Sequence, residues 1–159
     1  MEKKKKRVCF AASSGGHVEQ ILQLQPLMEE YDSCLITEWT SGTKDLKNKL
    51  NIPVHHLWQV NRHEKGYMKF LLRNIVRTVY SLLKERPRVI VTTGVLSMLP
   101  VCFLAKLTGA KIIYIESFAK TTSPTKSGKL MYKFADHFMV QWPTMLEVYP
   151  KAVYKGGLY

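Results

Sequence analysis

Short apolar runs of strand length alternate with stretches of helical periodicity along almost the whole chain. Residues 8–12 form the first apolar run, and the turn residues 13–16 separate it from a helical pattern that opens at His17. Because the strand segments are apolar throughout, both faces of the sheet are expected to be covered by helices. The pattern therefore predicts an α/β fold with a doubly wound, mostly parallel sheet.

Further strands and helices follow in strict alternation. The predicted strands after the first cover residues 33–38, 53–60, 87–93, 111–117 and 137–141. The predicted helices cover residues 18–30, 43–50, 67–84, 97–108, 126–135 and 144–149. Ligands of doubly wound sheets bind at the carboxyl ends of the strands. The candidate ligand-binding segments are therefore 13–17, 38–41, 92–94 and 116–127.

The segment 67–84 is the longest helical pattern, and it carries an apolar and a basic set of residues. The apolar set is predicted to face the core: Met68, Leu71, Leu72, Ile75, Val76, Val79, Leu82 and Leu83. The basic set recurs every fourth residue on a flank: Lys65, Lys69, Arg73 and Arg77. This flank is either a solvated helix face, the more common case, or a surface that neutralises anionic phospholipid at ~1 kcal/mol per basic residue. Exposed apolar residues of the next helix could then insert into the membrane.

The turn at Ser13, Ser14, Gly15 and Gly16 joins the first strand to its helix. Free backbone N–H groups and the positive end of the helix dipole favour an anion here, and glycines let a ligand approach the backbone closely. A nicotinamide site is disfavoured. The GxGxxG fingerprint is absent, although Glu38 stands about 20 residues on, where a ribose-binding acid would be expected.

His17 falls in the first turn of that helix. The dipole there lowers the proton affinity of an imidazole and keeps it neutral near pH 7, as a general base requires. The alternative is a histidine that only caps the helix or contacts solvent, and the local sequence favours neither.

The strongly basic composition favours anionic partners but does not say which kind of anion binds. The 159 residues suffice for one domain with a full core, and the formal charge of +12 favours anionic partners. Cys9, Cys34 and Cys102 lie in apolar runs without metal-ligand spacing, which predicts buried, reduced thiols in a cytosolic protein and no metal site. The basic arm 1–6 is not a secretory signal, and no apolar stretch reaches the ~20 residues of a membrane span.

Four motifs in register carry a family resemblance over the whole chain. They are Ser14-Gly15-Gly16-His17, Gly94 with Pro100, Glu116-Ser117, and Gln141-Trp142-Pro143. The chain resembles bacterial capsule and exopolysaccharide glycosyltransferase subunits. These are similar to the membrane-recruiting subunit of the two-chain UDP-GlcNAc transferase of dolichol-linked oligosaccharide synthesis. It is also similar to the amino-terminal domain of the transferase that forms lipid II.

The resemblance implies the Rossmann-like amino-terminal half of a GT-B glycosyltransferase, without a cofactor. Such a subunit would bind a lipid-diphosphate-linked acceptor at the cytoplasmic face of the cell membrane. A catalytic partner chain would supply the UDP-sugar site, so the hexosyltransferase activity would belong to the complex. Matched by motif, His17 and Glu116 would be catalytic. The acceptor diphosphate would lie against Ser13, Ser14, Gly15, Gly16 and Gly94.

The last segment, 149–159, is expected to be a docking tail of the single domain 1–159. Tyr154, Leu158 and Tyr159 supply anchors of the kind enriched at interface cores, and the two preceding glycines would let the chain bend onto a partner. The alternative is a frayed terminus.

Two other functions compete with the transferase subunit. One is a basic nucleic-acid-binding domain, although the aromatic residues lie in apolar segments rather than beside the lysines. The other is a complete small-molecule enzyme of Rossmann type, which the missing fingerprint disfavours.

Overall fold

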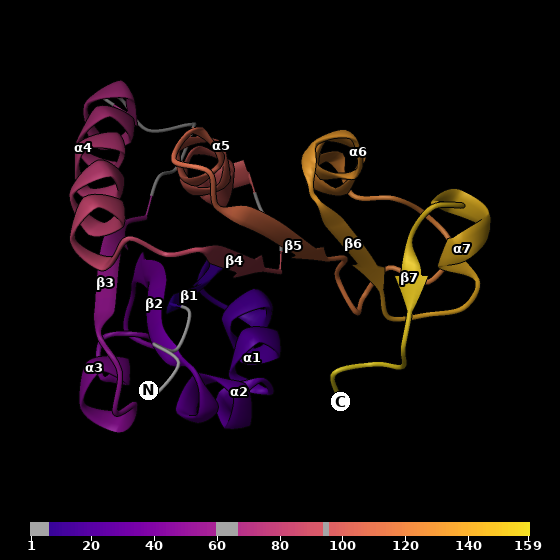
Figure 1. The fold of residues 1–159 in the computed structure, drawn as a ribbon, viewed down its shortest axis with the longest axis horizontal. Coiled ribbons are helices and arrows are strands. Elements are labelled where there is room, and N and C mark those ends of the chain that lie inside the picture. Colours follow the sequence, from indigo (N-terminus) through magenta and orange to yellow (C-terminus); the bar gives the residue numbers. More distant parts are fainter. Residues whose placement is uncertain (1–6, 60–66, 94–95) are drawn as a thin grey trace, which may run out of the picture.

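A seven-stranded parallel sheet forms the centre of the protein, and its strand order is β3-β2-β1-β4-β5-β6-β7 (Figure 1). The computed structural model describes residues 7–59, 67–93 and 96–159. The order reverses between β1 and β4, which creates the topological switch point of a doubly wound sheet. The strands are β1 (Arg7–Ala12), β2 (Asp32–Trp39), β3 (Val54–Trp58), β4 (Val89–Thr92), β5 (Lys111–Ile115), β6 (His137–Val140) and β7 (Val153–Tyr154).

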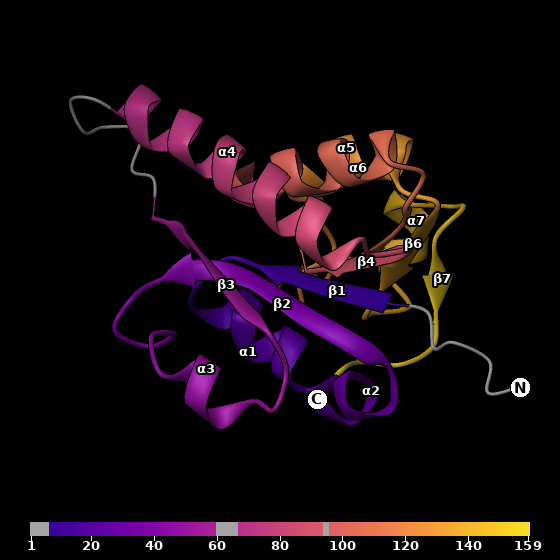
Figure 2. The same cartoon turned by 60° about the vertical axis from the view of Figure 1, so that its left-hand side comes forward.

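Helices cover both faces of this sheet (Figure 2). One layer contains α1 (Gly16–Leu22), α2 (Gln25–Glu30) and α3 (Leu46–Lys49). The other contains α4 (Tyr67–Glu85), the 3₁₀ turn η1 (Leu96–Met98) with α5 (Leu99–Leu107), α6 (Lys126–Phe134) and α7 (Met145–Val148). Successive residues of a strand point to opposite faces of the sheet, so they pack alternately into the two hydrophobic cores. Cys9 and Ala11 pack with α4 and α5, whereas Phe10 and Ala12 pack with α1 and α2.

The predicted fold class is confirmed, and most predicted elements are present within a few residues. The single helix expected at 18–30 is wrong, because α1 ends at Leu22 and α2 starts at Gln25. Pro26 lies in the first turn of α2, where its missing N–H is tolerated, and within one continuous helix its ring would clash with the Leu22 carbonyl. The two-residue strand β7, which pairs with β6, was not predicted.

The predicted core face of α4 is wrong for most of its residues. Only Leu82 is buried, and Leu71 and Ile75 are half-buried. Large exposed apolar side chains run along the helix instead: Met68, Leu72, Val76, Val79, Tyr80 and Leu83. We call these six residues the α4 apolar stripe.

Polar residues can occupy the buried face of α4 because they have hydrogen-bond or ion-pair partners there, as Asn74 and Glu85 show. The Asn74 amide accepts from the Trp58 N–H (2.8 Å) and donates to the Trp58 carbonyl (2.7 Å), which ties edge strand β3 to the helix. Glu85 ends the helix and is buried against β1 and β3. Helical periodicity alone cannot reveal such partners.

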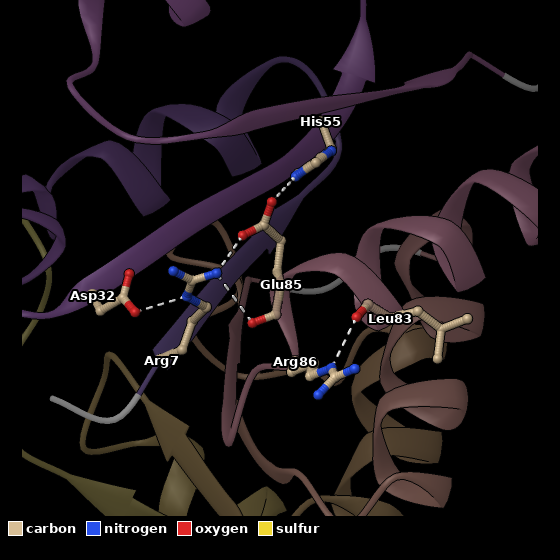
Figure 3. Close-up of polar contacts among 6 residues, drawn as sticks. All are labelled: Arg7, Asp32, His55, Leu83, Glu85 and Arg86. Atoms are coloured by element: carbon tan, nitrogen blue, oxygen red, sulfur yellow. Dashed lines mark hydrogen bonds and ion pairs between the residues drawn. The ribbon is translucent and has the colours of Figure 1, made fainter. Parts of the chain in front are cut away.

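Charged contacts close the amino ends of the strands. The buried Glu85 carboxylate accepts from Arg7 Nη1 (2.7 Å) and lies 2.7 Å from His55 Nε2, while Arg7 Nε also pairs with Asp32 at 2.8 Å (Figure 3). Three strands and the end of α4 are thereby joined at one edge.

A second network closes the same edge at β5 and β6. Asp136 accepts from the Ile112 N–H (2.9 Å), Lys111 Nζ (3.0 Å) and Lys106 Nζ (3.3 Å). Burial by itself would raise the pKa of Asp136, but these donors outweigh it and hold the pKa at about 2.

Candidate functional site

The loop between β1 and α1 is open, and its backbone geometry requires glycine at one position. Gly15 has φ 81° and ψ −147°, a region that residues with a Cβ essentially avoid. Among the described residues, no atom lies within 4 Å of where a Cβ on Gly15 or Gly16 would be. The loop therefore leaves room for a ligand against its backbone, at the switch point of the sheet.

Glu38, at the carboxyl end of β2, fixes the start of this loop. Its Oε2 accepts from the Ser14 N–H (3.2 Å) and the Ser14 hydroxyl (3.1 Å), and the side chain is buried. The Ser14 N–H is therefore already used, and Ser13 is buried beneath the loop. Gly15 and Gly16 remain as the open positions of the four predicted residues.

His17 is the second residue of α1 and faces a partly buried environment. The Thr93 hydroxyl donates to the His17 carbonyl (2.8 Å), which ties α1 to the end of β4. Burial lowers the pKa of His17, whereas the Thr93 backbone and the charges of Glu116 and Glu38 oppose that shift. The direction agrees with the expectation from sequence, but the cause is burial. Its Nδ1 is buried without a hydrogen-bond partner in the described part of the chain.

Glu116 follows β5 and is 1% exposed. Its Oε1 accepts from the Ser117 N–H (2.9 Å) and the Thr125 hydroxyl (3.0 Å), and its Oε2 accepts from the Tyr149 hydroxyl (2.8 Å). Burial and the adjacent carboxylate raise the pKa of Tyr149, so the phenol stays protonated and donates. Both carboxylate oxygens of this predicted catalytic residue are thus engaged within the chain.

The start of α6 is built against this carboxylate. Thr125 caps the helix by accepting from the Gly128 N–H at 2.8 Å. A Cβ at Gly128 would overlap the Glu116 carboxylate and the Tyr149 hydroxyl, so only glycine fits there. Sequence reasoning missed Thr125, Gly128 and Tyr149, although a glycine inside a helical pattern is a signal of close packing.

Of the remaining predicted site residues, some lie outside the described ranges, some are on α4, and the others belong to the C-terminal segment. Gly94, Lys65 and the arm 1–6 lie outside the described residues. Lys69, Arg73 and Arg77 are exposed on α4, and Arg77 also stacks over Trp58 (5.2 Å) and donates to the His56 carbonyl.

The C-terminal segment packs on the body of the protein. Tyr154 belongs to β7, Leu158 is half-buried against the α1 and α2 core, and Tyr159 packs its ring on Phe118. Tyr154 and Tyr159 still keep large exposed surfaces. The segment is therefore an ordered part of the surface at the end of the sheet.

Neither a metal centre nor a membrane-spanning helix is found in the ranges that the structure describes. No group of three or more metal-binding side chains converges among these residues. The three cysteines are buried and free, and burial raises the pKa of Cys102 to about 12. None of the described helices is both long and apolar enough to cross a bilayer.

Residues 8–158 match the family described as "Oligosaccharide biosynthesis protein Alg14 like". The chain belongs to this Alg14-like family. It is 28% identical over 181 residues to the mouse UDP-N-acetylglucosamine transferase subunit ALG14, and the match covers 96% of this chain and 82% of that protein. The Candida albicans subunit of the same name is 28% identical, with 99% and 83% covered.

Solved structures show the same fold for this Alg14-like chain. Acinetobacter baumannii MurG superposes with a TM-score of 0.72 at 16% identity, covering 87% of this chain and 42% of MurG. The UDP-N-acetylglucosamine 2-epimerase of Rickettsia bellii gives 0.69 at 11% identity, covering 97% and 45%. The chain thus spans less than half of either structure, and its fold is the Rossmann-like amino-terminal half of a GT-B protein.

Proposed function

We propose that this chain is the acceptor-binding subunit of a two-chain glycosyltransferase whose catalytic partner binds the UDP-sugar. The family match over residues 8–158 carries the proposal, because the curated relatives are named as subunits of a UDP-N-acetylglucosamine transferase. The correspondence to one half of a GT-B fold supports it. Transferase activity then belongs to the assembled pair, by which we mean this chain together with its partner.

The acceptor is a lipid-diphosphate-linked sugar, and its diphosphate lies against the loop Ser13 to Gly16; the motif resemblance adds Gly94 to the proposed ligands of the diphosphate. The open backbone at Gly15 and Gly16 supports this placement, since an anion can approach the main chain without meeting a side chain. Glu38 accepts two hydrogen bonds from Ser14 and thereby fixes the start of this loop.

His17 is the general base of the proposed reaction. A neutral imidazole accepts the proton of the acceptor hydroxyl as that oxygen bonds to the anomeric carbon of the donor sugar. The bond from this carbon to UDP breaks at the same time, and UDP leaves with the electron pair. Burial favours the neutral form of His17, and its Nδ1, which has no partner among the described residues, supports a site that a ligand completes.

Glu116 contributes to this reaction by holding neighbouring segments in place. Its carboxylate has no exposed surface to offer an acceptor, and it holds the start of α6 and residues 117–125. Its charge favours protonation of His17 during turnover. We therefore assign Glu116 as a positioning residue rather than a proton carrier.

The membrane surface is the outer face of α4, α5 and α6. The α4 apolar stripe is flanked by Lys69, Arg73 and Arg77. Helix α5, which lies beside α4 on the same face of the sheet (Figure 2), adds the exposed Phe103 and Leu107. On α6, lysines 126, 129 and 133 border an open groove of about 520 Å³. Exposed apolar side chains flanked by cations suit a bilayer with anionic lipids. Nucleic acid would bind the cations but would leave the apolar side chains exposed.

The proposed cellular setting is peripheral attachment at the cytoplasmic face of the cell membrane, in the synthesis of a capsular or exopolysaccharide repeat unit. The motif resemblance supports the polysaccharide product. The family description carries only the broader class of oligosaccharide synthesis, and the mouse and Candida albicans relatives are eukaryotic.

The partner docks on the C-terminal segment, with Tyr154, Leu158 and Tyr159 as its anchors. Tyr154 and Tyr159 are large side chains with exposed surface, and Leu158 fixes the backbone between them to the core. Affinity capture of this chain, co-expressed with the candidate partner encoded beside it, tests the whole proposal. We expect a stable complex with a glycosyltransferase partner, and capture of the chain alone would contradict it.

A further inference from the structure

Gln141, directly after β6, joins two segments that are far apart in sequence. It is buried, its Nε2 donates to the Glu116 carbonyl (2.8 Å), and its Oε1 accepts from the Leu158 N–H (3.0 Å). A single side-chain amide thus connects the end of β5 to the C-terminal segment. Buried polar groups whose partners are all supplied in this way define one geometry, because losing either partner leaves an unpaired group.

Trp142 makes a second connection to the same region. Its indole Nε1 donates to the Phe118 carbonyl (2.7 Å), and its ring lies 4.9 Å from the Phe118 ring. Tyr159 also packs edge-on against Phe118, with ring centres 5.0 Å apart. A Cβ on Gly157 would lie 3.3 Å from the Phe118 ring, so glycine lets the segment lie this close.

Residues 117–125 are therefore held from two directions. On one side the Glu116 carboxylate binds Ser117 and Thr125, as described above. On the other side Gln141 and Trp142 bind the Glu116 carbonyl, the Phe118 carbonyl and the C-terminal segment. The Thr144 hydroxyl adds a donor to the Thr121 carbonyl.

We infer that Gln141 and Trp142 are positioning residues that connect the partner-binding segment to residues 117–125 beside the acceptor site. The inference rests on the proposed function for the identity of the partner and the site. A partner that binds the C-terminal segment favours the arrangement in which Leu158 and Tyr159 lie against Gln141 and Phe118. Through these contacts it also favours the ordered form of the loop that follows Glu116.

Variants of Gln141 separate its two hydrogen bonds. Gln141→Met keeps the side-chain length and removes both bonds, whereas Gln141→Glu keeps an acceptor for the Leu158 N–H and loses the donor to the Glu116 carbonyl. Trp142→Phe removes only the indole donor. Gln25→Met is the matched control, because Gln25 is exposed on α2 and its side chain donates to the neighbouring Glu29.

Amide hydrogen exchange in the isolated chain is the first readout, and it needs no transferase activity. We expect faster exchange at residues 117–125 in Gln141→Met and Trp142→Phe, and no change in Gln25→Met. If Gln141→Met does not fold, Trp142→Phe carries the test. Unchanged exchange of this loop in the folded variants would overturn the inference.

Turnover of the assembled pair is the second readout. We expect kcat at saturating partner to fall about tenfold in Gln141→Met, with the KM for the UDP-sugar nearly unchanged and partner affinity lowered, because the arrangement that the partner favours is weakened. Deletion of Gly156 to Tyr159 removes the same bond together with two proposed partner anchors, so kcat is compared at saturating partner, where the combined variant should be no slower than the slower single variant. Multiplied losses would overturn the inference. Absence of transfer by the native pair would contradict the proposed function but leave the exchange result standing.

Discussion

The amino and carboxyl ends of the parallel strands form two opposite edges of the sheet, and they differ in how their polar groups are paired. At the amino ends, two ion pairs and the His55–Glu85 contact join β1, β2 and β3 to one another and to the end of α4 (Figure 3). Two further ion pairs of Asp136 join the start of β6 to α5 and β5. At the carboxyl ends, an open glycine loop follows β1, and four buried polar atoms have no partner among the described residues. They are His17 Nδ1, Thr37 Oγ1, Thr92 Oγ1 and Ser97 Oγ.

The difference indicates a role in stability for the amino ends and supports the proposed binding site at the carboxyl ends. Satisfied charges at the strand starts hold the elements in place, whereas unsatisfied groups at the strand ends retain capacity for a ligand. The division is not absolute, because Ser33 Oγ near the amino edge is also unpartnered. Variants at the two edges should therefore affect different measurements.

The largest expected effect is at the carboxyl edge. His17→Ala should lower the turnover of the assembled pair by about 10²-fold or more, because the proposed general base is lost. The melting temperature and partner binding should stay unchanged. His137→Ala is the control, since His137 is exposed at the amino end of β6. Full activity of His17→Ala would remove His17 from the chemistry.

The pH dependence sharpens the same assignment. Burial lowers the pKa of His17 below its ordinary value of 6.5, so the imidazole stays neutral and active at pH values where a free histidine is already protonated. The acid limb of kcat/KM should therefore lie below pH 6.5 and disappear in His17→Ala. A limb above 6.5 would contradict this environment.

Glu85 gives the matching test at the amino edge. Glu85→Ala leaves Arg7 and His55 without their buried carboxylate, and the unfolding free energy should fall by about 3 kcal/mol in urea titration. Turnover per folded molecule should be unchanged. Glu147→Ala, an exposed control on α7, should change stability by less than ~0.5 kcal/mol. A Glu85 variant of native stability would break the contrast between the edges.

Membrane attachment should be independent of both edges. Leu72 is 63% exposed on the α4 apolar stripe, so Leu72→Gln should weaken binding to anionic vesicles about tenfold without changing stability. Replacing Lys69, Arg73 and Arg77 by glutamine should weaken it further and reduce its salt sensitivity. Vesicle sedimentation measures both. Unchanged binding in all these variants would place the membrane surface elsewhere.

The smallest effect concerns Asp136. Its pKa of about 2 lies below the ordinary 3.8, so the stabilisation is fully present above about pH 4 and is lost as the pH falls toward 2. We expect about 1–2 kcal/mol, and Asp136→Asn should remove that part of the acid dependence. Identical acid unfolding profiles for the variant and the native chain would contradict this.

Sequence patterns predicted the architecture because apolar strands and turns are local signals. The same signals placed His17 and Glu116 just after the ends of predicted strands. The partners of Glu116 did not, since Thr125 and Tyr149 stand 9 and 33 residues away. The buried face of α4 was missed for a related reason. Asn74 is satisfied there by the backbone of Trp58, a contact that only the folded sheet creates.

The central claim is that this chain supplies the acceptor half of a site that a partner completes. The most direct test measures sugar transfer from radiolabelled UDP-sugar to a lipid-diphosphate-linked acceptor. It compares this chain alone, the partner alone and the assembled pair. The account predicts transfer only by the pair, with its rate about 10²-fold lower when His17→Ala replaces the native chain. Transfer by the purified chain alone, at a rate comparable with the pair, would contradict it.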